Sequence, residues 1–375
     1  MTAVPPLAYV ISPQPWAGFH VSKHHYAIAL AERGWQVIFV DPPVDLGRAG
    51  RIELSPTDVP GIGSLRYQTW FPYPIKFRSR WLFDRLMRLQ ARRLVAAAGK
   101  PDLVWDFDNA YQFRDLNVFR AGRTFFHLVD DVASAGLGAK NADHIFCLHS
   151  SFCLNAGCSF DEAYEVGHGL GVDHAQAAMK AQEQPRSAGP PHIGFVGNLA
   201  ADWLDWDAVE EMLIRHPEAK FTFWGPLPKG TVAPPLGRIK NSPSTSFPGL
   251  APTSEILAQV AGVDVWLIPF RAEKLLGGPL NSHKVLEYLS TGKAVVMNWL
   301  EAFEGNELVN MLDRDESGGL PDLLDRVLAD LDKANAPSLM QDRRSYALAR
   351  TYDRHLDRIL AAAGLGGLGD HRNAA

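Results

Sequence analysis

The chain has 375 residues, of which 46% are hydrophobic and 21% charged, and its formal net charge is −5 at pH 7. This composition excludes a disordered or fibrous chain, and the acidic balance argues against nucleic-acid binding, which usually needs a basic domain. No run approaches the roughly 18 to 20 apolar residues that a membrane-spanning helix needs, and the N-terminus lacks the basic region of a signal peptide.

Apolar runs alternate with helical periodicity through the first half of the chain. The pattern predicts a helix over 22–33, which Ser22 would cap and Gly34 would end. It also predicts strands at 7–12, 36–40, 103–107, 124–129, 144–148 and 164–166. Strands that alternate with helices are typical of βαβ units, so we expect a mostly parallel sheet.

Residues 174–191 interrupt this alternation, because they are polar and contain Pro185, Pro190 and Pro191. Beyond them the pattern predicts strands at 192–196, 220–224, 263–269 and 294–297, and helices at 206–215, 254–260, 283–290 and 320–331. We therefore expect an α/β protein with two Rossmann-like domains that face a central cleft. The expected parts are an N-terminal domain (1–173), a linker (174–191), a C-terminal domain (192–342), a closing helix (343–363) and a flexible tail (364–375).

The cysteines and the aspartate cluster near residue 205 are not expected to hold a metal. Cys147, Cys153 and Cys158 contain no C-x2-C pair and are too few for a disulfide framework, so they fit buried thiols in a reducing cytoplasm. Asp205 and its neighbour Asp207 are expected to cap the helix that begins at residue 206. The chain also lacks a dinucleotide-binding G-x-G-x-x-G, a P-loop and a serine-hydrolase elbow.

The most specific pattern lies between Asn281 and Val296. Asn281 or Ser282 can cap a helix on which Lys284 and Glu287 share one face. A lysine in the first turn of a helix opposes the helix dipole by about 0.3–1 kcal/mol, and a bound anion would remove that conflict. Glu287 can accept hydrogen bonds from a ribose diol, so the pair predicts a nucleotide-sugar site. The alternative is a solvated Lys–Glu pair on an exposed face.

This stretch resembles the donor-binding signature P-x-K-x-x-E-Y-L-A-x-G-x-P-V-V of GT-B glycosyltransferases in the GT4-like group. Position 279 is Pro, so of the family's paired glutamates only the second, Glu287, is present. The turn GHGLGVDH and the Asp130-Asp131 pair also resemble the glucuronosyltransferase of xanthan-type exopolysaccharide assembly. Other segments similar to the family follow in its order over nearly the whole chain: RGWQVIFVDPP (33–43), ADHIFCLHSSF (142–152), GHGLGVDH (167–174), IGFVGN (193–198) and DVWLIPF (264–270).

The resemblance implies the GT-B fold, with a closing helix that returns to the N-terminal domain, and no bound cofactor or metal. It also implies roles for individual residues at the donor site. Lys284 would contact the diphosphate and Glu287 the ribose. Phe270 would pack near the base, unless it belongs to the core. Gly197, Asn198 and Leu199 would line the phosphates, unless they form an ordinary strand-to-helix turn, and Asn281, Ser282 and His283 would add further contacts.

Catalysis would fall to an aspartate pair at the end of the strand 124–129. Adjacent carboxylates repel, and this can raise the pKa of one of them into the range of a general base. Asp131 aligns with the family's base and Asp130 would orient it, whereas the alternative is a pair that caps a helix. His20 and His24 surround the first strand-to-helix loop, so they would bind acceptor hydroxyls unless they only form a polar helix face.

The expected function is transfer of a sugar from a UDP- or GDP-sugar to a glycan or lipid-linked acceptor in cell-surface polysaccharide or glycoconjugate synthesis. Two alternatives stay open. A nucleotide-sugar epimerase of the same fold would need cleft carboxylates around the donor and no acceptor surface. A non-catalytic glycan-binding protein would have no reason to keep both Lys284 and Glu287.

Charge is unevenly distributed in the N-terminal half. Between Arg66 and Arg93 there are eight basic residues and one acid, Asp84, with seven aromatic residues among them. Aromatic rings with interleaved arginines are typical of contact with an anionic membrane surface, so we expect peripheral association with the inner face of the cell membrane. The alternative is that Trp81 and the leucines after it pack an amphipathic helix onto the sheet, with the arginines solvated outside.

Overall fold

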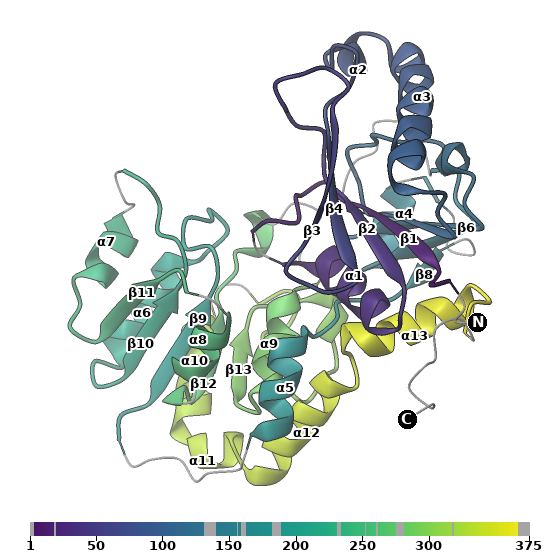
Figure 1. Cartoon of the computed structure of the whole chain (residues 1–375). Coiled ribbons are helices and arrows are strands. Elements are labelled where there is room, and N and C mark those ends of the chain that lie inside the picture. Colours follow the sequence, from purple (N-terminus) through teal and green to yellow (C-terminus); the bar gives the residue numbers. More distant parts are fainter. Residues whose placement is uncertain are drawn as a thin grey trace. The chain divides into compact units, whose positions relative to one another are not determined.

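The chain folds into two units in the computed structural model (Figure 1). Unit 1 comprises Met1–Gly167 and Tyr352–Ala375, and unit 2 comprises His168–Thr351. The structure describes residues 4–18, 20–130, 140–155, 157–158, 163–181, 189–230, 234–251, 253–259, 262–274, 281–316 and 319–366.

Unit 1 is built on an eight-stranded sheet in the order β3-β4-β2-β1-β5-β6-β7-β8. All neighbouring strands are parallel except β3 and β4, which form an antiparallel edge. The central strands are apolar and buried, as in sheets with helices on both faces. The strands are β1 (Leu7–Ile11), β2 (Gln36–Val40), β3 (Ile52–Pro56), β4 (Ile62–Tyr67), β5 (Leu103–Asp106), β6 (Arg123–Leu128), β7 (His144–Cys147) and β8 (Ala163–Glu165).

Helix α13, which ends the described chain, packs on α1 within unit 1. The guanidinium of Arg33, only 5% exposed, lies 2.7 Å from an Asp353 oxygen and 2.5 Å from an Asp357 oxygen, and this links the end of α1 to α13. Tyr352 and Leu356 of α13 belong to the hydrophobic core of the unit. The helices of unit 1 are α1 (Ser22–Glu32), α2 (Ile75–Arg78), α3 (Arg80–Ala98), η1 (Leu116–Phe119), α4 (Ser150–Asn155) and α13 (Tyr352–Ala362).

Unit 2 is built on a six-stranded, all-parallel sheet in the order β11-β10-β9-β12-β13-β14. Its strands are β9 (His192–Val196), β10 (Lys220–Trp224), β11 (Thr245–Gly249), β12 (Val265–Ile268), β13 (Ala294–Met297) and β14 (Asn310–Met311). Its helices are α5 (Val172–Lys180), α6 (Trp206–Arg215), α7 (Pro234–Lys240), α8 (Thr253–Gln259), η4 (Ala272–Lys274), α9 (His283–Ser290), η5 (Glu301–Phe303), α10 (Leu320–Ala329), α11 (Leu331–Ala334) and α12 (Pro337–Leu348). The predicted α/β class with two parallel sheets is confirmed.

Two predicted boundaries are wrong. The closing helix 343–363 is two helices, α12 and α13, because Thr351 forms a β-bridge with Leu170 and the backbone is extended there. The apolar periodicity continues across this break, so the sequence gives no sign of it. The predicted linker 174–191 begins inside α5, a regular helix of unit 2 that contacts α9 and α12.

Other differences lie at one helix end and at the edge of the first sheet. Ser22 is the first residue of α1 rather than its cap; the cap position is Val21, whose N–H donates to His24 Nδ1. The edge strands β3 and β4 were not predicted, because β3 is polar and largely exposed and shows no apolar alternation. In the part of the chain that the structure describes, no helix is long and apolar enough to span a bilayer.

Candidate functional site

Helix α9 begins at the end of unit 2's sheet without a side-chain cap. Ser282 occupies the cap position, but its side chain makes no capping hydrogen bond, and the Asn281 side chain accepts only from the Ser282 N–H. The first N–H groups of a helix have no partner within the helix, and uncapped they form a binding site for an anion. This is where the sequence predicts the donor diphosphate.

Lys284 lies in the first turn of α9 with its side chain partly buried. Its ammonium is 5.9 Å from the centre of the Phe195 ring, and burial lowers its pKa below the usual 10.5, while the Glu287 carboxylate raises it. Among the described residues, no carboxylate lies within ion-pair distance of this ammonium. A buried cation without a partner is costly, so the position favours an anionic ligand.

Two glycines bring the backbone of two loops together beneath Lys284. Gly197, after β9, has no side chain, and a Cβ there would lie 3.0 Å from Lys284 Cε and 2.8 Å from Phe195 Cζ. Gly225, after β10, has φ +138°, and a Cβ there would lie 1.7 Å from the Gly197 carbonyl oxygen. Tyr288 fixes the end of β9 to α9, because its hydroxyl accepts from the Val196 N–H (2.8 Å). Gly197 therefore makes room for the lysine stem, and Gly225 lets its own loop approach Gly197.

The structure places several predicted donor contacts elsewhere. The amide of Gly197 donates to the Trp224 carbonyl (2.9 Å) and that of Leu199 to the Pro226 carbonyl (3.1 Å), so neither is available to a phosphate. Leu199 and Phe270 are buried in the core of unit 2, which is the alternative considered for Phe270. Asn198 is exposed, and its Oδ1 accepts from the Ala200 N–H (3.1 Å). Of the predicted phosphate loop, Asn198 is exposed, Gly197 is partly exposed and Leu199 is buried.

Two histidines lie beside Lys284 at the start of α9. Glu287 lies 3.9 Å from His283 Nε2, one turn away on the same helix. The His168 ring lies 5.7 Å from the His283 ring, and burial lowers the pKa of His168 to about 4. A neutral imidazole therefore borders the uncapped helix end. His168 was not predicted as a site residue; its only sequence signal is its place in the turn GHGLGVDH.

Asp205 caps α6, as the sequence predicts, because its side chain accepts from the Ala208 N–H. Asp207, which was also predicted to cap, lies in the first turn of α6, and both aspartates pair with Arg271. Among the described residues, no group of three or more histidine, cysteine, aspartate or glutamate side chains is arranged to hold a metal ion.

Unit 1 has a cavity of about 660 Å³ at the carboxyl ends of β1 and β2, where open α/β sheets bind ligands. Trp16 lines it, and its indole N–H donates to Asp58 (2.9 Å). Asp41 accepts from the Trp16 amide (3.0 Å), and burial raises its pKa. Arg66 lines another part of the wall. Carboxylates, a guanidinium and an indole suit a ligand rich in hydroxyl groups. The sequence analysis missed this cavity, because β3 and β4, which form part of it, were not recognised.

The two predicted acceptor histidines have different surroundings. His24 is fully buried: its Nδ1 accepts from Val21 and its Nε2 is 3.1 Å from the Pro15 carbonyl, while burial lowers its pKa to about 4. His24 therefore holds the loop rather than an acceptor, which corrects its predicted role. His20 is partly exposed, and its ring lies 4.8 Å from the Trp16 ring in a tilted arrangement, beside the cavity.

A second polar group occupies the carboxyl ends of β5 and β6. Asp130 is exposed and accepts from Asn109 (3.3 Å), and Asp131 lies outside the described residues. Lys23 of α1 is 2% exposed; burial lowers its pKa, and the charges of Asp130 and Asp108 raise it. A buried cation thus lies near Asp130. Lys23 was not predicted as a site residue, because its burial depends on the folded structure.

At the end of β5, Asp106 and Lys140 form a fully buried ion pair at 2.6 Å. Lys140 also donates to the Asp108 carbonyl (2.6 Å), and burial raises the pKa of Asp106 to about 7. Asp108 accepts from the amides of Ala110 and Gln112. These bonds fix the loop after β5, which carries Asn109 to Asp130.

Solved structures resemble this fold over almost the whole chain, although no protein-family model and no curated protein matches the sequence. The trehalose-phosphate synthase of Burkholderia xenovorans, in complex with glucose-6-phosphate, has a TM-score of 0.67 at 14% identity over 96% of this chain and 100% of its own. HepE of Anabaena, in complex with UDP and glucose, has a TM-score of 0.65 at 13% identity over 96% of this chain and 100% of its own. Sucrose-phosphate synthase of Thermosynechococcus elongatus has a TM-score of 0.63 at 15% identity over 96% of this chain and 100% of its own. These likenesses confirm the predicted GT-B fold.

The close approach of Gly225 to Gly197 can be tested by substitution. We expect Gly225→Ala to lower the free energy of unfolding by about 3 kcal/mol or more, because it adds an atomic overlap to the cost of a positive φ. Gly230→Ala is the matched control: Gly230 has φ +89° with nothing within 4 Å of a Cβ, so it should cost about 1 kcal/mol. Urea unfolding measures both, and equal losses would contradict the account of the crossing loops.

Proposed function

We propose that the protein is a glycosyltransferase that binds a nucleotide-sugar on unit 2 and a hydroxyl-bearing acceptor on unit 1. The observation that carries this proposal is the partly buried, unpaired ammonium of Lys284 at the uncapped start of α9. The GT-B fold supports it, because several similar structures are named as UDP complexes or UDP-forming enzymes.

The donor diphosphate would bind Lys284 at the start of α9. Glu287, one turn along the helix, would accept hydrogen bonds from the two ribose hydroxyls. His283, His168 and Asn198 would complete the polar surroundings. Of the UDP- and GDP-sugars expected from the sequence, the names of the similar structures favour UDP-sugars.

The reaction needs a base and a stabilised leaving group. An acceptor hydroxyl loses its proton to a base, its oxygen bonds to the anomeric carbon, and the bond from that carbon to the β-phosphate oxygen breaks. The nucleoside diphosphate leaves with the electron pair, and Lys284 would stabilise its charge. We assign the base to Asp131 and its orientation to Asp130, which Asn109 and the buried charge of Lys23 hold in turn.

The acceptor cavity of unit 1 favours a transferase over an epimerase, which needs no second substrate site. Its carboxylates and indole suit a sugar, and His20 lies beside its Trp16 wall. We propose a glycan or lipid-linked acceptor, used in cell-surface polysaccharide synthesis at the cytoplasmic face of the membrane. Released nucleotide from UDP-, GDP- and dTDP-sugars, with glycan, lipid-linked and sugar-phosphate acceptors, tests the donor and the acceptor class.

Lys284→Ala should weaken UDP binding at least about tenfold, since a charge-assisted hydrogen bond contributes about 1.5–3 kcal/mol. Isothermal calorimetry measures the affinity. Lys240→Ala, which removes an exposed lysine of α7, is the control and should leave the affinity unchanged. UDP affinity unchanged in Lys284→Ala would contradict the donor site.

The lowered pKa of Lys284 predicts a pH dependence. Only the charged amine binds a diphosphate. UDP affinity should therefore be highest at pH values below the pKa of Lys284 in the free enzyme, and it should fall as the pH rises through that pKa, which lies below 10.5. Lys284→Arg stays charged throughout and serves as the reference, because both proteins share the titration of the nucleotide. Identical profiles from pH 7 to 10.5 would show that Lys284 does not titrate at the site.

Asp131→Asn should keep UDP binding and reduce turnover roughly 10²–10⁴-fold, the usual contribution of a general base. Asp130→Asn should reduce it less, because that residue orients rather than accepts the proton. Steady-state release of UDP measures both. If Asp131→Asn keeps most of its rate, the chemistry is instead a base-free transfer with retention of configuration.

A further inference from the structure

Helices α2 and α3, at one end of unit 1 (Figure 1), expose large apolar side chains. Phe77 is 80% exposed and Trp81 68%, and Leu82 and Leu89 are also exposed. The buried face of α3 consists of other residues: Phe83, Met87, Gln90, Ala91 and Leu94. In the alternative reading Trp81 and the leucines after it pack onto the sheet. Leu86 does pack against the core, but Trp81, Leu82 and Leu89 are exposed, so the alternative is wrong for these three. Grouped exposed apolar side chains mark an interaction site.

Arginines lie among these apolar side chains. Trp81, Arg85, Arg88 and Arg92 follow helical spacing and share one face of α3. Arg85 lies over the Trp81 ring at 5.3 Å. No carboxylate lies within ion-pair distance of Arg78, Arg85 or Arg92 among the described residues. The face is thus both apolar and positively charged, which fits an anionic membrane surface.

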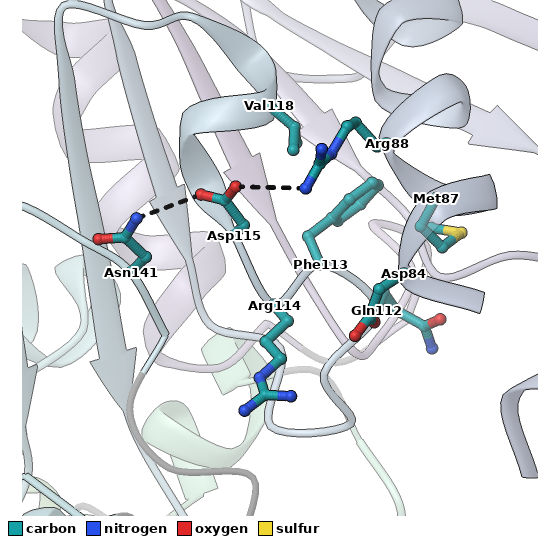
Figure 2. A pocket seen from close by; sticks show the side chains of 9 residues that line it. All are labelled: Asp84, Met87, Arg88, Gln112, Phe113, Arg114, Asp115, Val118 and Asn141. Carbon is teal, nitrogen blue, oxygen red and sulfur yellow. Dashed lines mark hydrogen bonds and ion pairs between the residues drawn. The ribbon is translucent and has the colours of Figure 1, made fainter. Parts of the chain in front are cut away.

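A cavity of about 280 Å³ opens beside this face, between α3, the loop before η1 and Asn141. Figure 2 shows Arg88, Asp115 and Asn141 in a row across it, with Arg88 4.0 Å from Asp115 and Asn141 3.4 Å from Asp115. Arg88 belongs both to the exposed face of α3 and to the wall of the cavity. The two features are therefore one continuous surface.

Among the side chains that line the cavity, the arginines suit an anion. Arg114 points away from the row in Figure 2 and has no carboxylate within ion-pair distance in the described chain. Asp84 is already paired with Arg80 at 2.8 Å. Gln112 is 7% exposed, and its Oε1 is buried, so it offers no contact to a ligand. Arg88 and Arg114 therefore present two separate positive charges at this surface.

We propose that α2 and α3 bind an anionic phospholipid membrane, with Phe77 and Trp81 inserted among the lipids and Arg88 and Arg114 each bound to a lipid phosphate beside the cavity. Each phosphate meets one guanidinium group. This extends the proposed function by bringing the enzyme to a lipid-linked acceptor. Membrane binding needs no nucleotide-sugar, so each claim can fail alone.

The test is co-sedimentation of the full chain with vesicles, without donor or acceptor. Vesicles of phosphatidylglycerol and phosphatidylcholine should bind it, pure phosphatidylcholine should not, and binding should weaken as salt rises. Phe77→Ser with Trp81→Ser, and separately Arg88→Gln with Arg114→Gln, should each reduce binding at least about fivefold, the effect of about one basic contact. UDP binding should be unchanged in both, which separates this outcome from failure of the donor site.

Matched controls come from unit 2. Ile214→Ser removes an apolar side chain that is 74% exposed, and Arg326→Gln with Lys333→Gln removes the same charge; neither should change vesicle binding. Equal binding to neutral vesicles, binding to none, or binding unchanged in both pairs of variants would overturn the proposal. If only the Arg88 and Arg114 variant binds normally, the contact of these two arginines with lipid phosphates is overturned.

Discussion

The charge of Lys284 constrains the structure around it in unit 2. Moving an ammonium out of water costs several kcal/mol unless another charge or hydrogen bond compensates it, and among the described residues the charge that acts on it is that of Glu287, one turn away. The backbone around this lysine leaves space for its side chain. Gly197 leaves space for its stem, Gly225 lets the neighbouring loop approach Gly197, and Tyr288 ties β9 to the same helix. We propose a diphosphate as the group that compensates this charge.

In unit 1, too, buried charges lie beside the polar side chains of the candidate site. Its sheet ends carry buried charges: Lys23 close to Asp130, and Lys140 paired with Asp106 at 2.6 Å. The buried pair is a costly way to stabilise a fold, but it fixes the loop that carries Asn109, and Asn109 holds Asp130. The positioning of the Asp130 carboxylate after β6 therefore accounts for the buried pair of Lys140 and Asp106 better than a gain in stability does.

The sequence identified what depends on local periodicity and spacing. It predicted β2, β9, β13, α6 and α9 at their observed bounds, and the shared helix face of Lys284 and Glu287. It could not reveal backbone amides that long-range contacts occupy, such as those of Gly197 and Leu199, or the burial of His24, which depends on the folded loop. The cavity at β1 and β2 was missed for a similar reason, since polar edge strands carry little apolar pattern.

A crystal structure with UDP bound tests the central claim, the anion site at Lys284, most directly. The account predicts diphosphate oxygens within hydrogen-bond distance of Lys284 Nζ and of the first amides of α9, with the ribose hydroxyls on Glu287. It also predicts that the Gly197 and Leu199 amides keep their present partners. UDP bound elsewhere, or at this helix with Lys284 contacting no phosphate oxygen, would contradict it.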